Sequence, residues 1–230
     1  MRKKIASGAL LNEQAFTVEC LTITDLPDIM RLQANVSATL PSRSILSPLN
    51  EEEFTRILTG NGLMVGVFID GIMVAFRAML KPEIDDAHLG IDAGLEKAEL
   101  PKVIYSEISS VDPDYRGNAL QNYMGKLLMK EINKQQYRYV CATVSPINVP
   151  SIKDKFSLRM EVVALKEKYT GLMRYIFMRD FTVRSKDRLY QETQWIPVEE
   201  IEKQQQALAS GFRGTSIEER DGKWCVKYEQ

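Results

Sequence analysis

The strongest constraint on the fold is a pair of apolar runs that are separated by only two residues. Leu63–Ile69 and Ile72–Leu80 are almost entirely aliphatic, aromatic or small, and the residues between them are Asp70 and Gly71. An Asp-Gly pair readily takes the left-handed backbone conformation that a tight two-residue turn requires. The pattern therefore predicts an antiparallel hairpin whose two strands are neighbours in a sheet.

Around this hairpin the sequence alternates between strand-like and helix-like segments. Alternating apolar residues predict further strands, at residues 16–23, 103–111, 137–144, 162–165 and 173–178. Apolar residues at helical spacing predict helices, at residues 25–40, 50–60, 118–134 and 148–158. Residues 81–101 are long, polar and acidic, and predict a loop with at most one short helix. This order is typical of an α/β protein with one central mixed sheet flanked by helices.

The charge balance of the chain excludes a broad class of partners. Its 230 residues include 30 basic and 31 acidic side chains, which gives a formal net charge of -1. Such a chain lacks the positive field that drives binding to nucleic acids or anionic membranes, so we expect neither partner. No apolar run approaches the roughly 20 residues that span a bilayer, and the N-terminus does not have the pattern of a signal peptide. A cytoplasmic location is therefore expected.

Few residues are suited to metal or redox chemistry. The three cysteines, Cys20, Cys141 and Cys225, lie far apart and form no C-x-x-C spacing, so we expect buried thiols in a reducing compartment. His88 is the single histidine. A histidine-rich metal site is thus excluded, and a Ser-His-Asp triad would depend on this one residue. We expect no metal cofactor.

The last part of the chain differs in character from the rest. Residues 198–209 predict a helix, and the pair Asp221-Gly222 predicts a hairpin. A segment of this length is too short to fold alone. We therefore divide the chain into a main domain, residues 1–181, and a small C-terminal α/β extension, residues 182–230, that packs on it.

One segment has the pattern of an anion-binding turn. Val111–Ala119 connects the end of a predicted strand to the start of a predicted helix. A helix N-terminus binds anions because its first N–H groups are unpaired and its dipole is positive there. Loops that hold phosphate are usually rich in glycine, whereas this segment has only Gly117, and neither G-x-G-x-x-G nor G-x-x-x-x-G-K is present. A nucleotide-binding protein of those classes is therefore the weaker interpretation.

These residues resemble a known family. The segments 111–117 and 144–151, with the helix between them, resemble the acetyl-CoA-binding core of the GNAT N-acetyltransferase superfamily. The element order from residue 16 to residue 181 is also similar to that fold. The family motif of Gln or Arg, two residues, Gly, one residue, then Gly or Ala falls on Arg116, Ala119 and Gln121. The first position is kept and the other two depart from the motif.

The resemblance implies acetyl-CoA as the co-substrate and assigns residues to it. Backbone N–H groups near the start of the helix would meet the pyrophosphate, with Arg116 adding positive charge, and backbone groups of the preceding strand would pair with the pantetheine arm. Asn148 lies where relatives place an asparagine near the thiol, although capping of its own helix explains this residue equally well. The residues implied to bind the co-substrate are Ser110, Val111, Arg116, Gly117, Asn118, Ala119, Gln121, Asn148 and Ser151.

Acetyl transfer to an amine needs a base for the amine and a proton for the leaving thiolate. Glu107 is the best candidate for the base, because a carboxylate in the middle of a strand is costly without a task or a partner. An ion pair with Arg77 would explain it equally well. For the acid, the family often has a tyrosine seven residues after the asparagine, where this chain has Lys155, which we expect to be a solvated charge on an exposed helix face. Tyr169 and Tyr175 are further phenols, so the acid stays unassigned.

Two functions of different classes follow from this resemblance. The first is an N-acetyltransferase that transfers acetyl from acetyl-CoA directly to a primary amine of a small molecule or peptide. The second is a binding module that keeps the fold and the ligand but has lost catalysis, which Ala119, Gln121 and the missing tyrosine favour. Thiol release with a panel of amines separates the two.

The extension provides a first test. Trp195, Trp224 and Tyr228 are large side chains that we expect to be buried against the main domain or, in a homodimer, against a second subunit. Deleting the residues after Phe181 should then expose apolar surface and lower both the soluble yield and the melting temperature. A truncated protein as soluble and as stable as the full chain would contradict this expectation.

Overall fold

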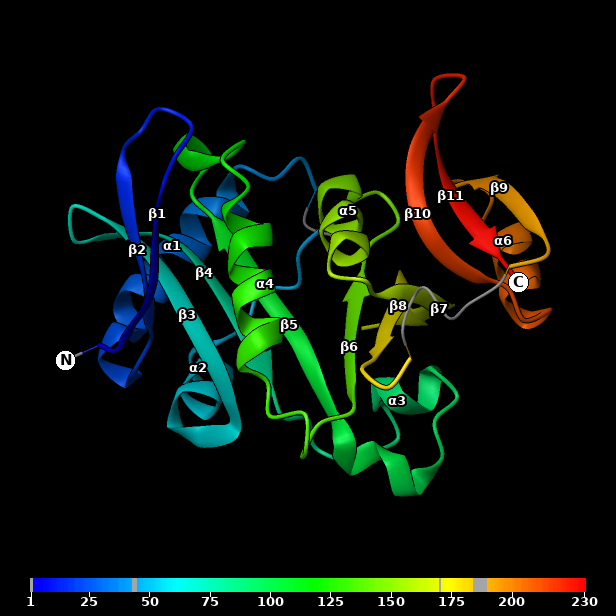
Figure 1. Ribbon diagram of the computed structural model, residues 1–230, viewed down its shortest axis with the longest axis horizontal. Coiled ribbons are helices and arrows are strands. Elements are labelled where there is room, and N and C mark those ends of the chain that lie inside the picture. The colour runs from blue at the N-terminus through cyan, green and yellow to red at the C-terminus, as the bar shows by residue number, and fades with distance from the viewer. Residues whose placement is uncertain (1, 43–44, 170, 184–189) are drawn as a thin grey trace. The chain divides into compact units, whose positions relative to one another are not determined.

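The computed structural model describes residues 2–42, 45–169, 171–183 and 190–230. The chain forms two compact units, residues 1–82 with 105–132 and residues 83–104 with 133–230. Each unit combines antiparallel strands with helices (Figure 1). The α/β class and the sheet flanked by helices are therefore as predicted.

The first unit is built on strands in the order β1-β2-β3-β4-β5, and each neighbouring pair is antiparallel. The strands are β1 Lys4–Ala9, β2 Ala15–Cys20, β3 Gly62–Ile69, β4 Ile72–Leu80 and β5 Val103–Val111. The predicted hairpin is confirmed as β3 and β4, and Asp70 and Gly71 have positive φ angles of 49° and 79°. Strand β1 was not predicted, because Ser7 and Gly8 interrupt its weak apolar pattern.

Helices cover both faces of this sheet. They are α1 Leu26–Ala38, α2 Glu51–Arg56 and α4 Leu120–Glu131. Phe76 and Ala78 of β4 pack in one core cluster with apolar side chains of α1 and α2, whereas Arg77 between them contacts α4. Because successive residues of a strand point to opposite faces, α4 lies on the face opposite to α1 and α2.

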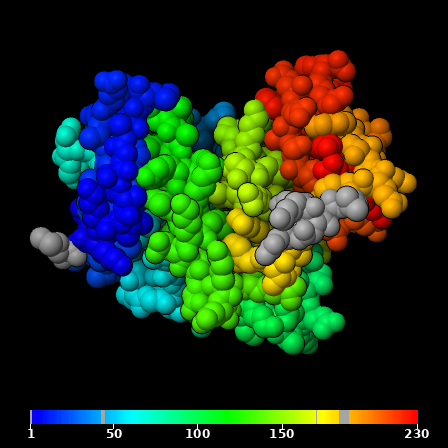
Figure 2. Space-filling model, in the orientation of Figure 1, coloured from blue at the N-terminus to red at the C-terminus, as the bar shows by residue number. Residues whose placement is uncertain are grey.

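The N-terminal strands are tied to α4 on that second face. The hydroxyl of Tyr123 in α4 donates to the carbonyl of Ser7 at 3.2 Å, and its ring meets the ring of Phe16 edge to face at 5.4 Å between centroids. Figure 2 shows the N-terminal strands and α4 side by side. An irregular strand is thus held by contacts that its own sequence pattern does not reveal.

Helix α2 begins as the sequence predicts. The side chain of Asn50 accepts a hydrogen bond from the N–H of Glu53, and the Glu53 carboxylate accepts one from the N–H of Asn50 at 2.7 Å, which is a capping box. A single π-helical turn, Ile57–Asn61, follows, and Gly60 in it has a φ of 118°. Gly60 therefore ends the helix as expected.

The second unit also contains one run of strands, in the order β6-β8-β7-β10-β11-β9. These strands are β6 Tyr139–Val144, β7 Glu161–Lys168, β8 Leu172–Asp180, β9 Thr193–Pro197, β10 Arg213–Arg220 and β11 Lys223–Glu229. The helices are α3 Leu89–Asp92, α5 Val149–Ser157 and α6 Ile201–Ala209. Short helix α3 and a 3-10 helix, Lys97–Lys102, lie in the predicted acidic loop, which therefore has two helical segments where at most one was predicted. Strand β9 was not predicted either.

The C-terminal residues continue the sheet of the second unit. Strand β10 joins β7 through the pair Gly214 and Val162. A β-carbon on Gly214 would lie 2.8 Å from the β-carbon of Val162, so only glycine allows this approach. The predicted helix and hairpin of the extension are confirmed as α6 and β10–β11. Residues 184–189 lie outside the described residues, and the boundary at residue 181 stays a prediction.

Gln204 of α6 is the polar centre of this packing. Its side chain is fully buried, and its Oε1 accepts hydrogen bonds from the hydroxyls of Tyr175 at 2.6 Å and Tyr228 at 2.9 Å. Its Nε2 donates to the carbonyls of Pro197 and Val198. One amide thus uses both acceptor and both donor positions to join α6, β8, β11 and the end of β9.

The large aromatic side chains of the extension differ in burial. Tyr228 is fully buried, as expected. Trp195 and Trp224 are only half-buried within the single chain, and their burial against a second subunit stays a prediction. The guanidinium of Arg220 lies 4.5 Å from the ring of Trp195, and the ammonium of Lys153 lies 4.1 Å from that of Trp224. These indoles are covered by cations, which keep contact with water, rather than by apolar residues.

In the part of the chain that the structure describes, no helix is both long enough and apolar enough to cross a membrane.

The contacts of Gln204 lead to a prediction for stability. Gln204→Leu would leave two buried phenol hydroxyls and the Val198 carbonyl without their partner, while the Pro197 carbonyl keeps the N–H of Glu200, so we expect a loss of about 3 kcal/mol in the free energy of unfolding. Urea unfolding measures this loss. The matched control is Gln206→Leu on the exposed face of the same helix, which should change stability by less than about 0.5 kcal/mol. Equal losses in the two variants would contradict the assignment.

Candidate functional site

The turn between β5 and α4 is organised by its own side chains. The Asp112 carboxylate accepts a hydrogen bond from the N–H of Asp114 at 3.0 Å, within the short 3-10 turn that follows β5. Asn118 links the turn to its surroundings, because Oδ1 accepts from the N–H of Leu11 at 3.0 Å and Nδ2 donates to the carbonyl of Tyr115 at 3.1 Å. The Asn118 side chain therefore holds the backbone of the turn and does not cap the helix.

The backbone enters α4 through two left-handed residues. Gly117 has a φ of 83°, and Ala119, which directly precedes the helix, has a φ of 55° and a ψ of 19°. Ala119 provides no side-chain cap, so no capping side chain occupies the start of α4. Such a helix start can hold an anion such as a pyrophosphate.

The left-handed conformation of Ala119 shows why the GNAT motif has glycine at this position. The motif has glycine where this chain has Ala119, and a residue with a β-carbon pays about 1–2 kcal/mol for this conformation. Ala119 is thus tolerated at a cost in stability. It keeps the backbone donor that the motif requires.

The other two motif residues differ in their contacts. Arg116 is exposed, and its Nη2 donates to the hydroxyl of Thr39 at the end of α1 at 2.9 Å. Gln121 is half-buried, and its backbone carbonyl accepts from the Nη1 of Arg77 at 3.0 Å. The guanidinium of Arg116 is accessible to a ligand, while the backbone of Gln121 is anchored from the interior.

Glu107 lies at a β-bulge. Ala78 of β4 pairs with Ile108, but the next residue, Met79, pairs with Ser106, so Glu107 is the extra residue of β5. A bulge changes the direction of the side chain that it carries. The bulge could not be predicted from the apolar pattern, because that pattern continues through it.

The surroundings of Glu107 suit a base. Burial, assisted by the nearby charge of Glu53, raises the pKa of the Glu107 carboxyl from 4.5 to about 7. Within the described residues no ion pair holds this carboxylate, and the alternative of a pair with Arg77 is not seen. Arg77 instead contacts Ser106 and Gln121. A carboxyl with a pKa near neutrality can accept a proton and return it.

Ser110 is the second polar residue of interest in β5. It is 2% exposed, and within the described residues its hydroxyl has no hydrogen-bond partner. Buried hydroxyls are normally paired, so an unpaired one is available to a ligand or to water. Val111, the last residue of the strand, is half-buried.

Asn148 and Ser151 lie in the second unit, at the start of α5. The Oδ1 of Asn148 accepts a hydrogen bond from the N–H of Ser151 at 3.2 Å, so Asn148 caps its own helix. This confirms one of the two roles considered for Asn148. The cap does not conflict with a ligand role, because the amide Nδ2 is a separate donor.

Lys155 corrects a prediction. We expected an exposed, solvated ammonium, but Lys155 is 5% exposed and its Nζ lies 3.2 Å from the carboxylate of Asp154, which is also buried. Helical spacing placed Lys155 on the polar face of α5, and the packing of the unit covers that face. Tyr175 binds Gln204 in the interior, whereas Tyr169 is 48% exposed with its hydroxyl 3.2 Å from that of Thr143.

His88, Cys141 and Cys225 are buried, whereas Cys20 is half-buried, which differs from the expectation for its thiol. His88 is 1% exposed and caps α3, with Nδ1 accepting from the N–H of Gly90 at 3.0 Å, and burial lowers the pKa of its imidazole. Cys141 is buried, and burial raises the pKa of its thiol to about 12. In the described ranges no three His, Cys, Asp or Glu side chains are grouped as a metal site would need.

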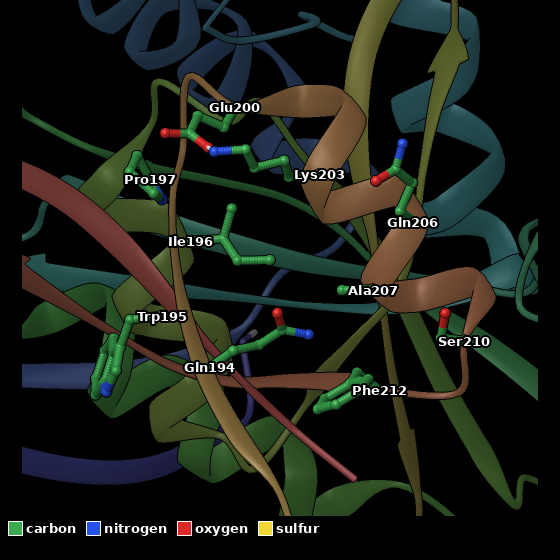
Figure 3. Close-up of a pocket in the computed structure, with 10 residues that line it drawn as sticks. All are labelled: Gln194, Trp195, Ile196, Pro197, Glu200, Lys203, Gln206, Ala207, Ser210 and Phe212. Carbon is green, nitrogen blue, oxygen red and sulfur yellow. Dashed lines mark ion pairs between the residues drawn. The ribbon is translucent and has the colours of Figure 1, made fainter.

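The extension contains a cavity that the sequence did not indicate. It has a volume of about 560 Å³ and lies between β9 and α6. Figure 3 shows Gln194 and Ile196 pointing from β9 toward α6, and the ion pair of Glu200 with Lys203 at its edge. Because β9 was not predicted, its packing against α6 could not be anticipated. None of the predicted site residues lines this cavity.

Comparison with solved structures identifies the fold. The ribosomal-protein-S18-alanine N-acetyltransferase from Escherichia coli is 18% identical, with a TM-score of 0.55 over 76% of this chain and 99% of its own. The GNAT domain of PAT from S. lividans is 17% identical, with a TM-score of 0.55 over 76% of this chain and 96% of its own. A putative acetyltransferase from Salmonella typhimurium, solved with acetyl-CoA, is 15% identical, with a TM-score of 0.54 over 74% and 96%.

No family model and no curated protein matches the sequence. The likeness to the solved structures shows that the chain has the fold of the GNAT N-acetyltransferases, so the predicted resemblance is confirmed at the level of the fold.

The two left-handed residues before α4 give a matched pair of variants. A β-carbon on Gly117 would meet nothing within 4 Å. Gly117→Ala should therefore lower the free energy of unfolding only by the strain of a left-handed alanine, about 1–2 kcal/mol. Ala119→Gly removes the same strain but raises the conformational entropy of the unfolded chain. We therefore expect the free energy of unfolding to rise by up to about 1 kcal/mol. Urea unfolding of both variants tests this. A loss of stability in Ala119→Gly would contradict the left-handed assignment.

Proposed function

We propose that the protein is an acetyl-CoA-dependent N-acetyltransferase that transfers the acetyl group directly to a primary amine of a small molecule or a peptide. The observation that carries this proposal is the combination of an uncapped helix start and a bulged carboxylate on one strand–turn–helix segment. The fold is that of the GNAT N-acetyltransferases, which supports acetyl-CoA as the co-substrate. The chain's three cysteines are free thiols, which supports a cytoplasmic location.

The anion would be held by the start of α4. No capping side chain occupies the first turn of this helix, and the helix dipole favours negative charge there. Arg116 is exposed at this turn and adds a cation. In the neighbouring strand, the hydroxyl of Ser110 and the backbone of Val111 would meet the pantetheine arm.

Glu107 would act as the base. Its carboxylate accepts a proton from the amine, whose nitrogen then attacks the thioester carbonyl carbon. The new C–N bond forms as the C–S bond breaks, and the leaving thiolate takes up a proton. Because the pKa of Glu107 is about 7, the carboxylate is ionised and ready to accept a proton above that pH.

A peptide or protein amine is a natural acceptor for this proposal. One of the proteins with a similar structure is a ribosomal-protein-S18-alanine N-acetyltransferase. The second candidate function is an acyl-CoA-binding module without turnover. This module is favoured by Gln121, which departs from the family motif. It is also favoured by Lys155, which forms a buried ion pair with Asp154 at the position where the family often has a tyrosine.

Binding and turnover distinguish these candidates. Calorimetry with acetyl-CoA tests the ligand, and thiol release with a panel of amines and N-terminal peptides tests the reaction. Absence of binding would refute both functions. Binding without thiol release for any amine would favour the module.

Glu107→Gln is the decisive variant. We expect the turnover rate to fall by about 100-fold or more, with the Kd for acetyl-CoA unchanged, because the amide cannot accept the proton. In the natural chain, kcat/KM should rise with pH and level off above about 7, since Glu107 must be ionised.

Glu53→Gln is the matched control for this pH dependence. It removes the charge that raises the pKa of Glu107 while its amide oxygen can still cap Asn50, so the pH profile should move to lower pH. Full activity of Glu107→Gln would eliminate Glu107 as the base.

A further inference from the structure

Arg77 is a fully buried cation in the middle of the first unit. It is 1% exposed in β4, between two residues that pack against α1 and α2. Its Nη1 donates to the backbone carbonyl of Gln121 in α4 at 3.0 Å, and its Nη2 donates to the hydroxyl of Ser106 in β5 at 2.9 Å. One guanidinium therefore joins three elements that are far apart in the sequence.

These contacts fall on the two elements that carry the proposed site. Gln121 is the second residue of α4, in the turn whose N–H groups would meet a diphosphate. Ser106 directly precedes the bulged residue Glu107. A guanidinium is planar and donates in fixed directions, so it sets the orientation of the first turn of α4 relative to β5.

The positive charge of Arg77 also favours an anion at the start of α4. A guanidinium stays protonated in proteins, and here it lies behind the positive end of the α4 dipole. Burying a cation is costly, and an apolar residue would fill the interior of a strand at a lower cost in desolvation. The gain from this arrangement is a helix start that is held in position and made more positive.

We propose that Arg77 is a positioning residue for the diphosphate of CoA, which rests on the proposed function. It does not touch the ligand. It anchors the Gln121 carbonyl so that the open N–H groups of α4 keep the direction needed for the anion, and it adds positive charge beneath them.

The test compares CoA with S-acetylpantetheine, which lacks both the diphosphate and the 3′-phosphoadenosine of CoA and carries an acetyl group on its sulfur. Calorimetry with the two ligands is carried out on the natural chain, Arg77→Met and Arg77→Lys. For Arg77→Met we expect the Kd for CoA to rise about tenfold or more, as for the loss of a charge-assisted hydrogen bond. The Kd for S-acetylpantetheine should change by less than about twofold, because positioning acts only on the diphosphate.

Arg77→Lys separates orientation from charge. Lysine keeps the cation but not the planar fork, so the Kd for CoA should lie between those of the natural chain and Arg77→Met. This variant also keeps the test decisive if Arg77→Met does not fold. In steady-state kinetics both variants should raise the KM for acetyl-CoA more than they lower kcat, whereas general destabilisation would not separate the two constants.

Arg174→Met is the matched control. Arg174 is also a buried arginine, at 3% exposure, and its Nη1 donates to a carbonyl of its own strand, that of Met173. Its loss should leave the ratio of the two Kd values unchanged. An equal rise of both Kd values in Arg77→Met, or a CoA affinity like that of the natural chain, would overturn the proposal. If the natural chain does not bind CoA, the proposed function itself fails.

Discussion

The register between β4 and β5 determines what each residue of β5 can contact. Ala78 pairs with Ile108 and Met79 with Ser106, so one extra residue, Glu107, is accommodated between them. Without this bulge, strict alternation would place Ser106 and Ile108 on the same face. With it, Ile108 joins the core under α1 and α2, while Ser106 reaches Arg77 on the face of α4. The direction of the carboxylate and the anchoring of the helix thus have one origin.

Backbone conformation also determines what the turn after β5 can bind. An anion can approach the start of α4 only where side chains leave the first N–H groups open, and the two left-handed residues achieve this. Asn118, which in another setting would cap the helix, is held by Leu11 and Tyr115. A single glycine is sufficient here because the alanine accepts the second left-handed position at a moderate cost in free energy.

Packing in the extension depends on a polar group rather than on large apolar ones. Gln204 satisfies two phenols and two carbonyls in the interior, whereas both tryptophans stay at the surface beneath cations. A buried amide with all its hydrogen bonds made specifies one arrangement of its neighbours, because any shift leaves a polar group unpaired. Sequence patterns rank aromatic residues above glutamine as core residues, and therefore found Tyr228 but missed Gln204.

Local chemistry was enough to predict much of this protein. The Asp70-Gly71 hairpin, the Asn50 cap, the start of α4 and the general class of the fold depend on turn propensity, capping and apolar periodicity, which act over a few residues. Strands β1 and β9, the burial of Lys155 and the bulge at Glu107 could not be predicted in this way. They depend on which surfaces meet after the chain has folded. The sequence by itself thus determined the elements and the candidate residues, whereas the tertiary structure decided their register, burial and direction, because desolvation and strand pairing are properties of the assembled sheet.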